Sequence, residues 1–486
     1  MVRIPGFHPG YRGSNPLGVT NCNKYTKHNK TVQTFQIEFQ KQKLKHLTGF
    51  LMLRFAPSPT GDMHIGNLRV ALFNYIVSKQ RGEELTIRIE DTDKNRNIEG
   101  KDIEILQILK KFGIDYLNVT YQSGNIRFHQ QFASQLLQQN KAFNCFCKSE
   151  ELEAKREQAK KDGIAYRYDG TCQKLTDMEV LNREDSSTIR LVRPENAIGF
   201  KDHIKGDMEF QPNEIDSFII LRKDKYPTYN FACAVDDMLS DISLIIRGED
   251  HLSNTPKQIA IQKAVGYDKS VEYAHLPIIL NISGKKMSKR DDASSVQWLL
   301  DEGFLPEAIT NYLISLGNKT PKEIFKLDEV FEWFSLSNLS KSPAKFDIDK
   351  LRFINREHLL ELPIEDIAKE FGYRGDEMME ILKIYREESH TLKEIKEKVD
   401  KIFSKKEVSE EWSEGVAKIR DVISNMSELP DDFNDLRKAI QKESGLKGKN
   451  LFKPLRIFLT GAENGPELGE IYPYLKRYME DLVRWI

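Results

Sequence analysis

The stretch of residues 51–93 constrains the fold most, because it has the pattern of a strand, a loop, a helix and a second strand. Residues 51–55 are apolar, and residues 56–61, with the sequence APSPTG, cannot form regular structure. Apolar side chains then recur at helical spacing, at Ile65, Leu68, Leu72, Tyr75 and Ile76. Residues 85–90 alternate between apolar and polar, as in a half-buried strand. This order predicts a parallel sheet.

The middle of the chain interrupts this sheet and then resumes it. Residues 129–214 have a mixed pattern, with a charged helix expected near 149–162 and short strands near 187–193, so we interpret them as an insertion. Further elements are expected as strands at 215–222, 229–235 and 243–247, a helix from Thr255-Pro256 to before Gly266, and an apolar strand at 275–280. Beyond residue 300 the periodicity is almost wholly helical.

The first 51 residues differ in composition from the rest of the chain. They contain eight Lys or Arg and one acidic residue, Glu38, without a sustained helical or strand period. They lack the apolar region of a secretory signal and have few of the Arg and Ser residues of an organellar transit peptide. We interpret them as a basic extension that is unstructured or results from a start codon assigned too early. N-terminal sequencing of the native protein tests this hypothesis.

Length and composition limit the function classes. A chain of 486 residues is long enough for three or four domains of about 100–200 residues each. Its apolar runs are far shorter than the roughly 18–20 residues of a membrane span, so we expect no membrane partner. The net charge of −1 means that any nucleic-acid binding must come from local basic patches. Five unevenly spread cysteines argue against a disulfide framework and favour a reducing, cytoplasmic location.

Two short motifs have the chemistry of a nucleotide site. His64 and Gly66 lie where the first loop turns into the first helix, a place where backbone N–H groups and the helix dipole favour phosphate. There His64 is suited to bind a triphosphate, and Gly66 lets an adenosine approach the backbone. Residues 284–290, with the sequence GKKMSKR, would neutralise a pentavalent α-phosphate and the departing pyrophosphate, with Lys289 as the best candidate. Each string alone also fits a surface turn or a solvated charge run.

Together the two motifs resemble the paired signatures of the class I aminoacyl-tRNA synthetases. The longer string RFAPSPTGDMHIGN, residues 54–67, resembles the glutamyl-tRNA synthetases in particular. Further blocks are present in family order, namely RIEDTD at 88–93, YPTYNF at 226–231 and IRGEDH at 246–251. Fainter similarity continues through residues 340–342 and 449–456, so the resemblance covers nearly everything after residue 51.

The resemblance implies an enzyme that activates glutamate with ATP and Mg²⁺ to glutamyl-adenylate and transfers it to the 3′ end of tRNA(Glu). The implied catalytic residues are His64, Gly66, Lys286 and Lys289, the ATP-binding residues are His64, Gly66, Ser288 and Lys289, and the glutamate-binding residues are Arg54, Ser58, Glu90, Tyr229 and Arg247. Arg54 and Arg247 would hold carboxylates as forked donors, and Glu90 would accept the ammonium group. The family position occupied here by Cys233 varies among relatives.

The resemblance also implies the domain organisation of an α/β fold. A class I Rossmann-like catalytic domain with a parallel sheet contains an inserted acceptor-stem domain and precedes an all-α anticodon-binding region. After the extension at 1–51, the predicted boundaries are 52–128 and 215–300 for the catalytic halves, 129–214 for the insert, 301–345 for a stem-contact region and 346–486 for the anticodon-binding domain. A monomer is the family expectation.

Cysteines cluster in the predicted insert. Cys145, Cys147 and Cys172 are accompanied by Tyr168, four residues before the last of them. Some glutamyl-tRNA synthetases hold zinc here with a histidine as fourth ligand, but the matching position is Lys174, which is not an ordinary zinc ligand. Tyr168 is the candidate replacement, because its spacing resembles that of a tRNA-modifying relative. Structural zinc and three reduced cysteines in a small core both remain open.

Three alternative functions compete with this interpretation. The truncated relative that glutamylates a modified tRNA base lacks an anticodon-binding half, and the long helical tail argues against it. A catalytically silent tRNA-binding paralogue should have lost its ATP residues, whereas His64, Gly66 and Lys289 are present. No sequence motif distinguishes a third alternative, a paralogue that charges tRNA(Gln) for later amidation.

Overall fold

The computed structural model describes residues 51–287 and 291–486. The predicted basic extension, apart from Leu51, and the predicted ATP-binding residues Ser288 and Lys289 therefore lie outside the described residues. No helix in the described ranges is long and apolar enough to cross a membrane.

A seven-stranded sheet forms the centre of the α/β part, in the order β3-β2-β1-β9-β10-β6-β7. Its strands are β1 (Met52–Phe55), β2 (Glu84–Ile89), β3 (Val119–Tyr121), β6 (Ile198–Asp202), β7 (Gly206–Phe210), β9 (Ile242–Gly248) and β10 (Glu272–Leu276). All neighbouring pairs are parallel except the hairpin of β6 and β7. The predicted Rossmann-like parallel sheet is thus confirmed.

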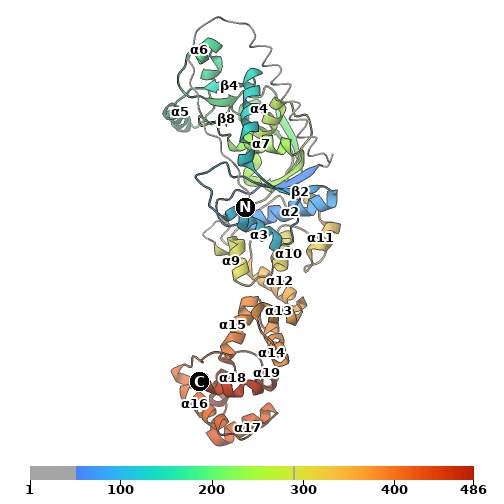
Figure 1. Ribbon diagram of the computed structural model, residues 1–486, viewed down its shortest axis with the longest axis vertical. Helices are drawn as coiled ribbons and strands as arrows, with labels where there is room; N and C mark the ends of the chain where they lie inside the picture. Colours follow the sequence, from blue (N-terminus) through green and yellow to red (C-terminus); the bar gives the residue numbers. More distant parts are fainter. Residues whose placement is uncertain (1–50, 288–290) are drawn as a thin grey trace, which may run out of the picture. The chain divides into compact units, whose positions relative to one another are not determined.

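Helix α2 (Ile65–Arg81) connects β1 to β2 and covers the sheet, as the helical spacing of its apolar residues predicted (Figure 1). Its side chains Ile65, Leu68 and Leu72 are fully buried. The helix ends at Gly82, whose φ of 64° is the left-handed conformation that glycine adopts most readily. The next helix, α3 (Lys101–Lys111), lies between β2 and β3 in the chain.

A second, smaller sheet begins in the predicted insert, residues 129–214, and takes its third strand from beyond that boundary. Its strands β4 (Ala142–Cys145), β5 (Thr188–Leu191) and β8 (Ile219–Leu221) pair antiparallel in that order. The helices α4 (Ile126–Gln138), α5 (Ser149–Lys161) and α6 (Asp177–Leu181) accompany this sheet, and α5 confirms the expected charged helix (Figure 1). Between β5 and β8 the chain returns to the main sheet as β6 and β7, which the sequence pattern did not indicate.

Three of the expected strands differ from the structure. The strand expected at 215–222, where the main sheet was predicted to resume, is β8, which belongs to the smaller sheet instead. Residues 229–235 belong to helix α7 (Tyr229–Leu239), not to a strand. This helix is buried nearly all round, and its residues 231–235 form a continuous apolar run, which a buried helix and a buried strand share. The strand expected at 275–280 is divided at Pro277, which cannot donate to a ladder, into β10 and β11 (Ile279–Leu280). Helix α8 (Thr255–Val265) ends before Gly266 as predicted.

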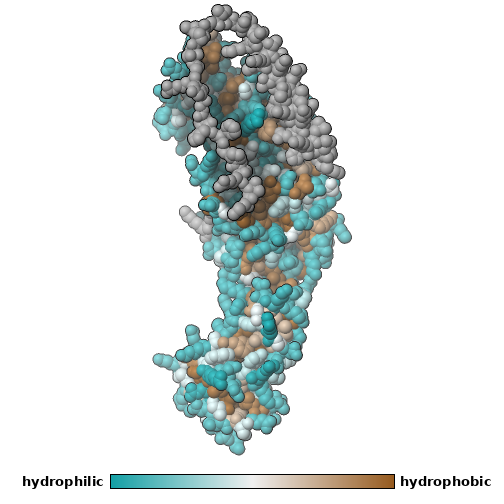
Figure 2. Space-filling model, in the orientation of Figure 1, coloured by the Kyte–Doolittle hydropathy of each residue, from teal (hydrophilic) through white to brown (hydrophobic). Residues whose placement is uncertain are grey.

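Helices dominate after residue 291, as the periodicity predicted. They are α9 (Val296–Asp301), α10 (Pro306–Ser315), α11 (Leu327–Trp333), α12 (Ile348–Glu361), α13 (Ile364–Phe371), α14 (Asp376–Glu387), α15 (Leu392–Ile402), α16 (Glu410–Ser424), α17 (Phe433–Ser444), α18 (Lys449–Thr460), α19 (Leu468–Leu475) and α20 (Met479–Arg484). A short strand, β12 (Ala344–Lys345), pairs with β11. Hydrophilic side chains lie around the periphery of these helices, which bury their apolar sides against one another (Figure 2).

Candidate active site

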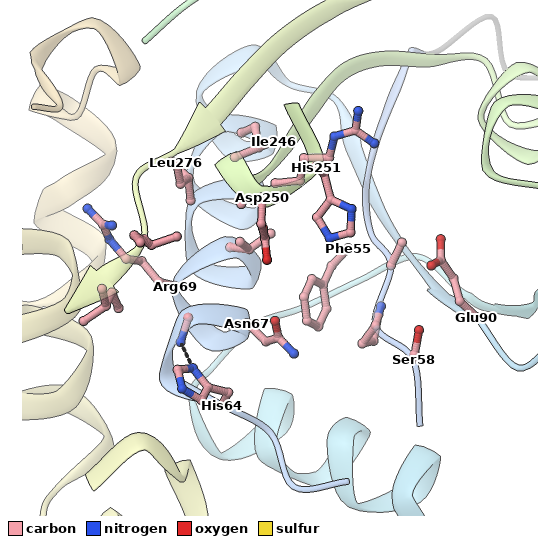
Figure 3. A pocket seen from close by; sticks show the side chains of 18 of the residues that line it. Phe55, Ser58, His64, Asn67, Arg69, Glu90, Ile246, Asp250, His251 and Leu276 are labelled. Atoms are coloured by element: carbon pink, nitrogen blue, oxygen red, sulfur yellow. Dashed lines mark hydrogen bonds between the residues drawn. The ribbon is translucent and has the colours of Figure 1, made fainter. Parts of the chain in front are cut away.

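A cavity of about 630 Å³ opens at the carboxyl ends of β1, β2 and β9, where parallel sheets commonly bind ligands. The predicted site residues that line it are Arg54, Ser58, His64, Gly66, Glu90, Tyr229, Arg247 and Lys286. Of these, Ser58, His64 and Glu90 are labelled in Figure 3. The structure therefore brings together every predicted catalytic, ATP-binding and glutamate-binding residue that it describes. Asp250 and His251 also line the cavity and were not singled out from the sequence, although both belong to the IRGEDH block.

His64 forms the N-terminal cap of α2. Its Nδ1 accepts a hydrogen bond of 3.0 Å from the Gly66 backbone N–H, drawn in Figure 3. An acceptor role for Nδ1 places the proton of the neutral ring on Nε2. A Cβ at position 66 would come within 3.2 Å of His64 Nδ1, which is tighter than ordinary contact. Gly66 therefore leaves room for the imidazole that caps the helix.

A buried network of four charges lies beside the cavity. Arg54 donates from Nε to Asp237 Oδ1 at 3.0 Å and from Nη2 to Oδ2 at 3.4 Å. Arg88 also donates to Asp237, and its Nη2 lies 3.2 Å from Glu90 Oε1. Burial alone would raise the pKa of Asp237, but Arg54 and Arg88 hold that pKa below its usual value. Two cations thus balance two anions in a group that is at most 9% exposed.

Asp237 was not predicted as a site residue. Its partners Arg54 and Arg88 lie 183 and 149 positions away in the chain, so no local pattern reveals their pairing. The sequence does show Asp236 and Asp237 next to an apolar segment. Acidic residues are rarely buried without a partner, so this pair could have been noted as a candidate for buried ion pairing.

Arg247 is held by neutral acceptors instead. Its Nη1 lies 2.8 Å from Gln258 Oε1, its Nη2 lies 2.6 Å from Thr255 Oγ1, and its Nε lies 3.1 Å from His275 Nε2. Arg247 is only 6% exposed, yet it lines the cavity. These contacts fix the plane of the guanidinium without neutralising its charge.

Tyr229 and Lys286 also line the cavity, and each has an ionisable neighbour that lines it too. The Tyr229 hydroxyl oxygen lies 3.0 Å from His251 Nδ1, within hydrogen-bond distance, and burial raises the pKa of Tyr229, so the phenol stays neutral. Lys286 pairs with Asp250 at 3.0 Å. The predicted catalytic Lys286 is therefore anchored at the cavity edge by a carboxylate.

The cysteine cluster lies apart from this cavity, in the smaller sheet. The Sγ atoms of Cys145, Cys147 and Cys172 all lie within 4.8 Å of one another. Tyr168 Oη lies 3.6 Å from Cys145 Sγ and 3.5 Å from Cys147 Sγ, and the sulfurs of Cys147 and Cys172 are 3.6 Å apart. Lys174, at the position of the usual fourth ligand, is exposed. Four potential ligands therefore converge, with Tyr168 as the fourth.

Arg190 supports this cluster electrostatically. Its Nε lies 3.2 Å from Cys145 Sγ, and its guanidinium carbon lies 4.2 Å from the centre of the Tyr168 ring. Burial alone would raise the pKa of Cys145, but the hydrogen bond from Arg190 lowers it to about 7. The thiol closest to Arg190 is thus the one most readily converted to thiolate.

Lowering the pH from about 7.5 to about 5.5 should lower the melting temperature. Burial holds the pKa values of His251, His275 and His358 below the ordinary value of 6.5. The unfolded chain then binds more protons than the folded one, so stability is lost as the pH falls through 6.5 towards the folded-state values. Circular dichroism melts across this range measure the slope, which His358→Gln should reduce. A melting temperature that stays constant contradicts this prediction.

Comparison with known proteins covers most of the chain. The family model described as class I tRNA synthetases (E and Q), catalytic domain, matches residues 51–353, and that of an anticodon binding domain matches residues 357–479. The chain is 59% identical over 433 residues to glutamate–tRNA ligase 2 of Sulfurimonas denitrificans and 60% identical to glutamate–tRNA ligase 1 of Nitratiruptor sp.. Each alignment covers 89% of this chain and 100% of the relative.

Solved structures agree with the sequence relatives. A glutamate tRNA ligase from Elizabethkingia meningosepticum in complex with its amino acid superposes with a TM-score of 0.76 at 26% identity. The glutamate-tRNA synthetase of Elizabethkingia anophelis superposes with a TM-score of 0.75 at the same identity. Both comparisons cover 90% of this chain and 99% of the solved one.

Proposed function

This chain belongs to the class I tRNA synthetases for glutamate and glutamine and is a glutamate–tRNA ligase, and we propose that the tRNA it charges is tRNA(Glu). Enzymes of this class use ATP with Mg²⁺. The observation that best supports glutamate as the amino acid is the cavity itself, where two buried arginines and one buried glutamate converge. A dicarboxylate with an ammonium group has the complementary charges.

We assign the binding roles from these contacts. Arg54 and Arg247 hold the two carboxylates, because each guanidinium is oriented by other protein groups and retains N–H donors beyond them. Glu90 accepts the ammonium group. Its Oε1 is held by Arg88 and by the Cys233 thiol at 3.1 Å, while within the described residues its Oε2 has no hydrogen-bond partner. Ser58 and Tyr229 line the same end of the cavity and supply hydroxyl groups.

The chemistry requires no nucleophilic side chain. A carboxylate oxygen of glutamate attacks the α-phosphorus of ATP, the bond to pyrophosphate breaks, and the adenylate forms. The terminal ribose hydroxyl of the tRNA then attacks the activated carbonyl and AMP leaves. We propose that His64 and Gly66 bind the nucleotide at the start of α2, and that Lys286, with Ser288 and Lys289, stabilises the phosphate charge.

A second tRNA substrate is the alternative. The relatives are named glutamate–tRNA ligase 1 or 2, a numbering used where an organism has two such enzymes. A paralogue that charges tRNA(Gln) is therefore the alternative to test. Discrimination between the two tRNAs would lie in the helices matched by the anticodon-binding model, residues 357–479.

Charging assays test the proposal. The purified full chain is incubated with ATP, radiolabelled glutamate and, separately, transcripts of tRNA(Glu) and tRNA(Gln). Labelling of tRNA(Glu) alone supports the proposal, and labelling of tRNA(Gln) alone overturns it in favour of the alternative. Glu90→Gln should abolish labelling, whereas Glu84→Gln, an exposed residue at the start of the same strand, should not.

We also propose that the cysteine cluster holds structural zinc through Cys145, Cys147, Cys172 and Tyr168. Zinc bound at about 2.3 Å to sulfur and about 2.0 Å to oxygen gives tetrahedral edges of about 3.8 Å between sulfurs and about 3.5 Å between sulfur and oxygen. The distances of 3.6 Å between Cys147 and Cys172 and of 3.5 Å between Cys147 and Tyr168 fit this geometry. Bound zinc would tie the link between β4 and α5, through Cys147, and the turn at Cys172 to the end of β4 at Cys145.

Protein purified without chelator should contain about one zinc per chain, as expected for a closed structural site. Tyr168→Phe removes one ligand and should weaken zinc binding at least about tenfold in a competition with a coloured chelator. Tyr166→Phe, the matched change at a half-buried tyrosine two positions earlier, should bind zinc like the natural chain. Elemental analysis that finds no stoichiometric zinc in untreated protein would exclude the site.

A further inference from the structure

The charge of Arg247 is not neutralised by an adjacent carboxylate. Arg54 pairs directly with Asp237, whereas no carboxylate in residues 51–287 or 291–486 forms an ion pair with Arg247. The carboxylate next in line is Asp202, which lies on the far side of the His275 ring. Of the three groups that orient Arg247, the ring is the one that holds Nε and the one that connects the guanidinium to a carboxylate.

The contacts of His275 determine where its proton lies. Arginine has only donors, so the Nε of Arg247 can bond to His275 Nε2 at 3.1 Å only if that nitrogen accepts. The hydroxyl of Thr255, which itself accepts from Arg247, lies 3.0 Å from the same nitrogen and donates to it. The proton of the neutral ring must then be on Nδ1, which lies 2.6 Å from Asp202 Oδ2.

Asp202 is itself rigidly held. Its Oδ1 accepts the backbone N–H groups of Ile204 at 2.9 Å and Lys205 at 2.8 Å, and its Oδ2 also accepts the backbone N–H of His275 at 3.1 Å. The carboxylate is 1% exposed and His275 is fully buried. Both oxygens of Asp202 thus accept hydrogen bonds. Because Oδ2 accepts the proton on His275 Nδ1, Nε2 carries no proton and can accept from Arg247.

We propose that Asp202 and His275 are positioning residues that hold Arg247 in the orientation that binds a carboxylate of glutamate, an inference that rests on the proposed role of Arg247. Asp202 selects the ring tautomer, and the ring in turn accepts from the guanidinium. Neither residue lines the cavity, so neither touches the substrate. The effect should fall on the amino acid, because Asp202 and His275 lie on β6 and β10, whereas His64 and Gly66 lie at the start of α2.

The topology shows why this arrangement links two parts of the protein. Asp202 is the last residue of β6, which pairs with β10 at Tyr273. The chain enters β6 from β5 of the smaller sheet and returns from β7 to β8 of that sheet. The hairpin of β6 and β7, which joins the main sheet between two strands of the smaller one, thus supplies Asp202, the carboxylate that contacts His275.

Asp202→Asn tests the tautomer directly. With its oxygen towards the N–H groups of Ile204 and Lys205, an asparagine leaves only the backbone N–H of His275 facing its amide nitrogen, whereas the reverse orientation would leave two N–H groups facing it. The first orientation is therefore favoured, and in it the amide nitrogen donates to His275 Nδ1. The ring proton then moves to Nε2 and points at the N–H of Arg247. We expect the KM for glutamate to rise at least about tenfold, with the KM for ATP changed less than about twofold, in aminoacylation at saturating tRNA.

His275→Gln should have a smaller effect than Asp202→Asn and should offset that variant in the double mutant. Its carboxamide oxygen can accept from Arg247 whatever residue 202 presents, so the KM for glutamate should rise less than in Asp202→Asn. The double variant should then have a KM for glutamate no higher than that of His275→Gln alone. This non-additivity should be confined to the KM for glutamate, whereas a merely structural coupling of the two contacting residues would also appear in the KM for ATP. His358→Gln, a buried histidine bonded to Asn311 in the helical part, is the matched control and should leave both KM values unchanged.

The outcomes separate this inference from the proposed function. Additive effects, or parallel increases in both KM values with a lowered melting temperature, would overturn the positioning role. If Arg247→Lys raises the KM for glutamate while Asp202→Asn and His275→Gln do not, the relay is wrong and the glutamate site stands. If Arg247→Lys leaves that KM unchanged, the proposed glutamate site is wrong.

Discussion

Asp237→Asn should lower the free energy of unfolding of the catalytic part by about 3–5 kcal/mol, the usual cost of leaving buried charges without their partner. Asp237 is the only carboxylate that both Arg54 and Arg88 contact in the described residues, and all three side chains are at most 5% exposed. Asparagine keeps the shape but removes the charge, so among the described residues only Arg88 would keep a paired carboxylate, Glu90, and Arg54 would have none. Urea unfolding followed by circular dichroism, compared with the natural chain, measures the loss.

Asp421→Asn is the matched control for this change. Asp421 pairs with Arg420 at 2.9 Å, but its side chain is 64% exposed. Ion pairs so open to water contribute little to stability, so no measurable change is expected. Equal losses in the two variants would show that burial of the Asp237 network is not the cause.

Arg54→Lys should lower kcat/KM for glutamate at least about 100-fold, because a displacement of about 1 Å at a reacting centre has an effect of that size. Arg54 engages both oxygens of Asp237 with Nε and Nη2 and still has N–H groups left for a substrate carboxylate. A lysine retains the charge but has a single ammonium group, which cannot reproduce both sets of bonds. Steady-state aminoacylation with varied glutamate measures the effect.

Arg81→Lys is the control, because Arg81 is the last residue of α2, at the end of that helix away from His64. Arg81 pairs with Glu272 at 2.9 Å, and both side chains are substantially exposed, at 28% and 44%. This variant should retain the kinetics of the natural chain. Arg54→Lys with unaltered kcat/KM would remove Arg54 from the glutamate site.

Local periodicity predicted much of the fold. The alternation of residues 85–90 and the helical spacing of the apolar residues after His64 predicted β2 and α2, because each element shows one polar and one apolar side. The same reasoning was wrong at 229–235, because residues 231–235 form a continuous apolar run, which a buried helix and a buried strand share. The site residues came from motif resemblance, and those that the structure describes lie around one cavity.

The sequence by itself determined the family resemblance, the order of the main elements and the identity of the residues around the cavity, since these reside in contiguous motifs and short periods. Only the tertiary structure decided how those residues are held. Asp237 meets Arg54 across 183 positions, and Asp202 meets His275 only because β6 leaves the insert and pairs with β10. Strand pairing and buried charge pairing join residues that are distant in the chain, and they are selected by the packing of the whole sheet, which no local pattern encodes.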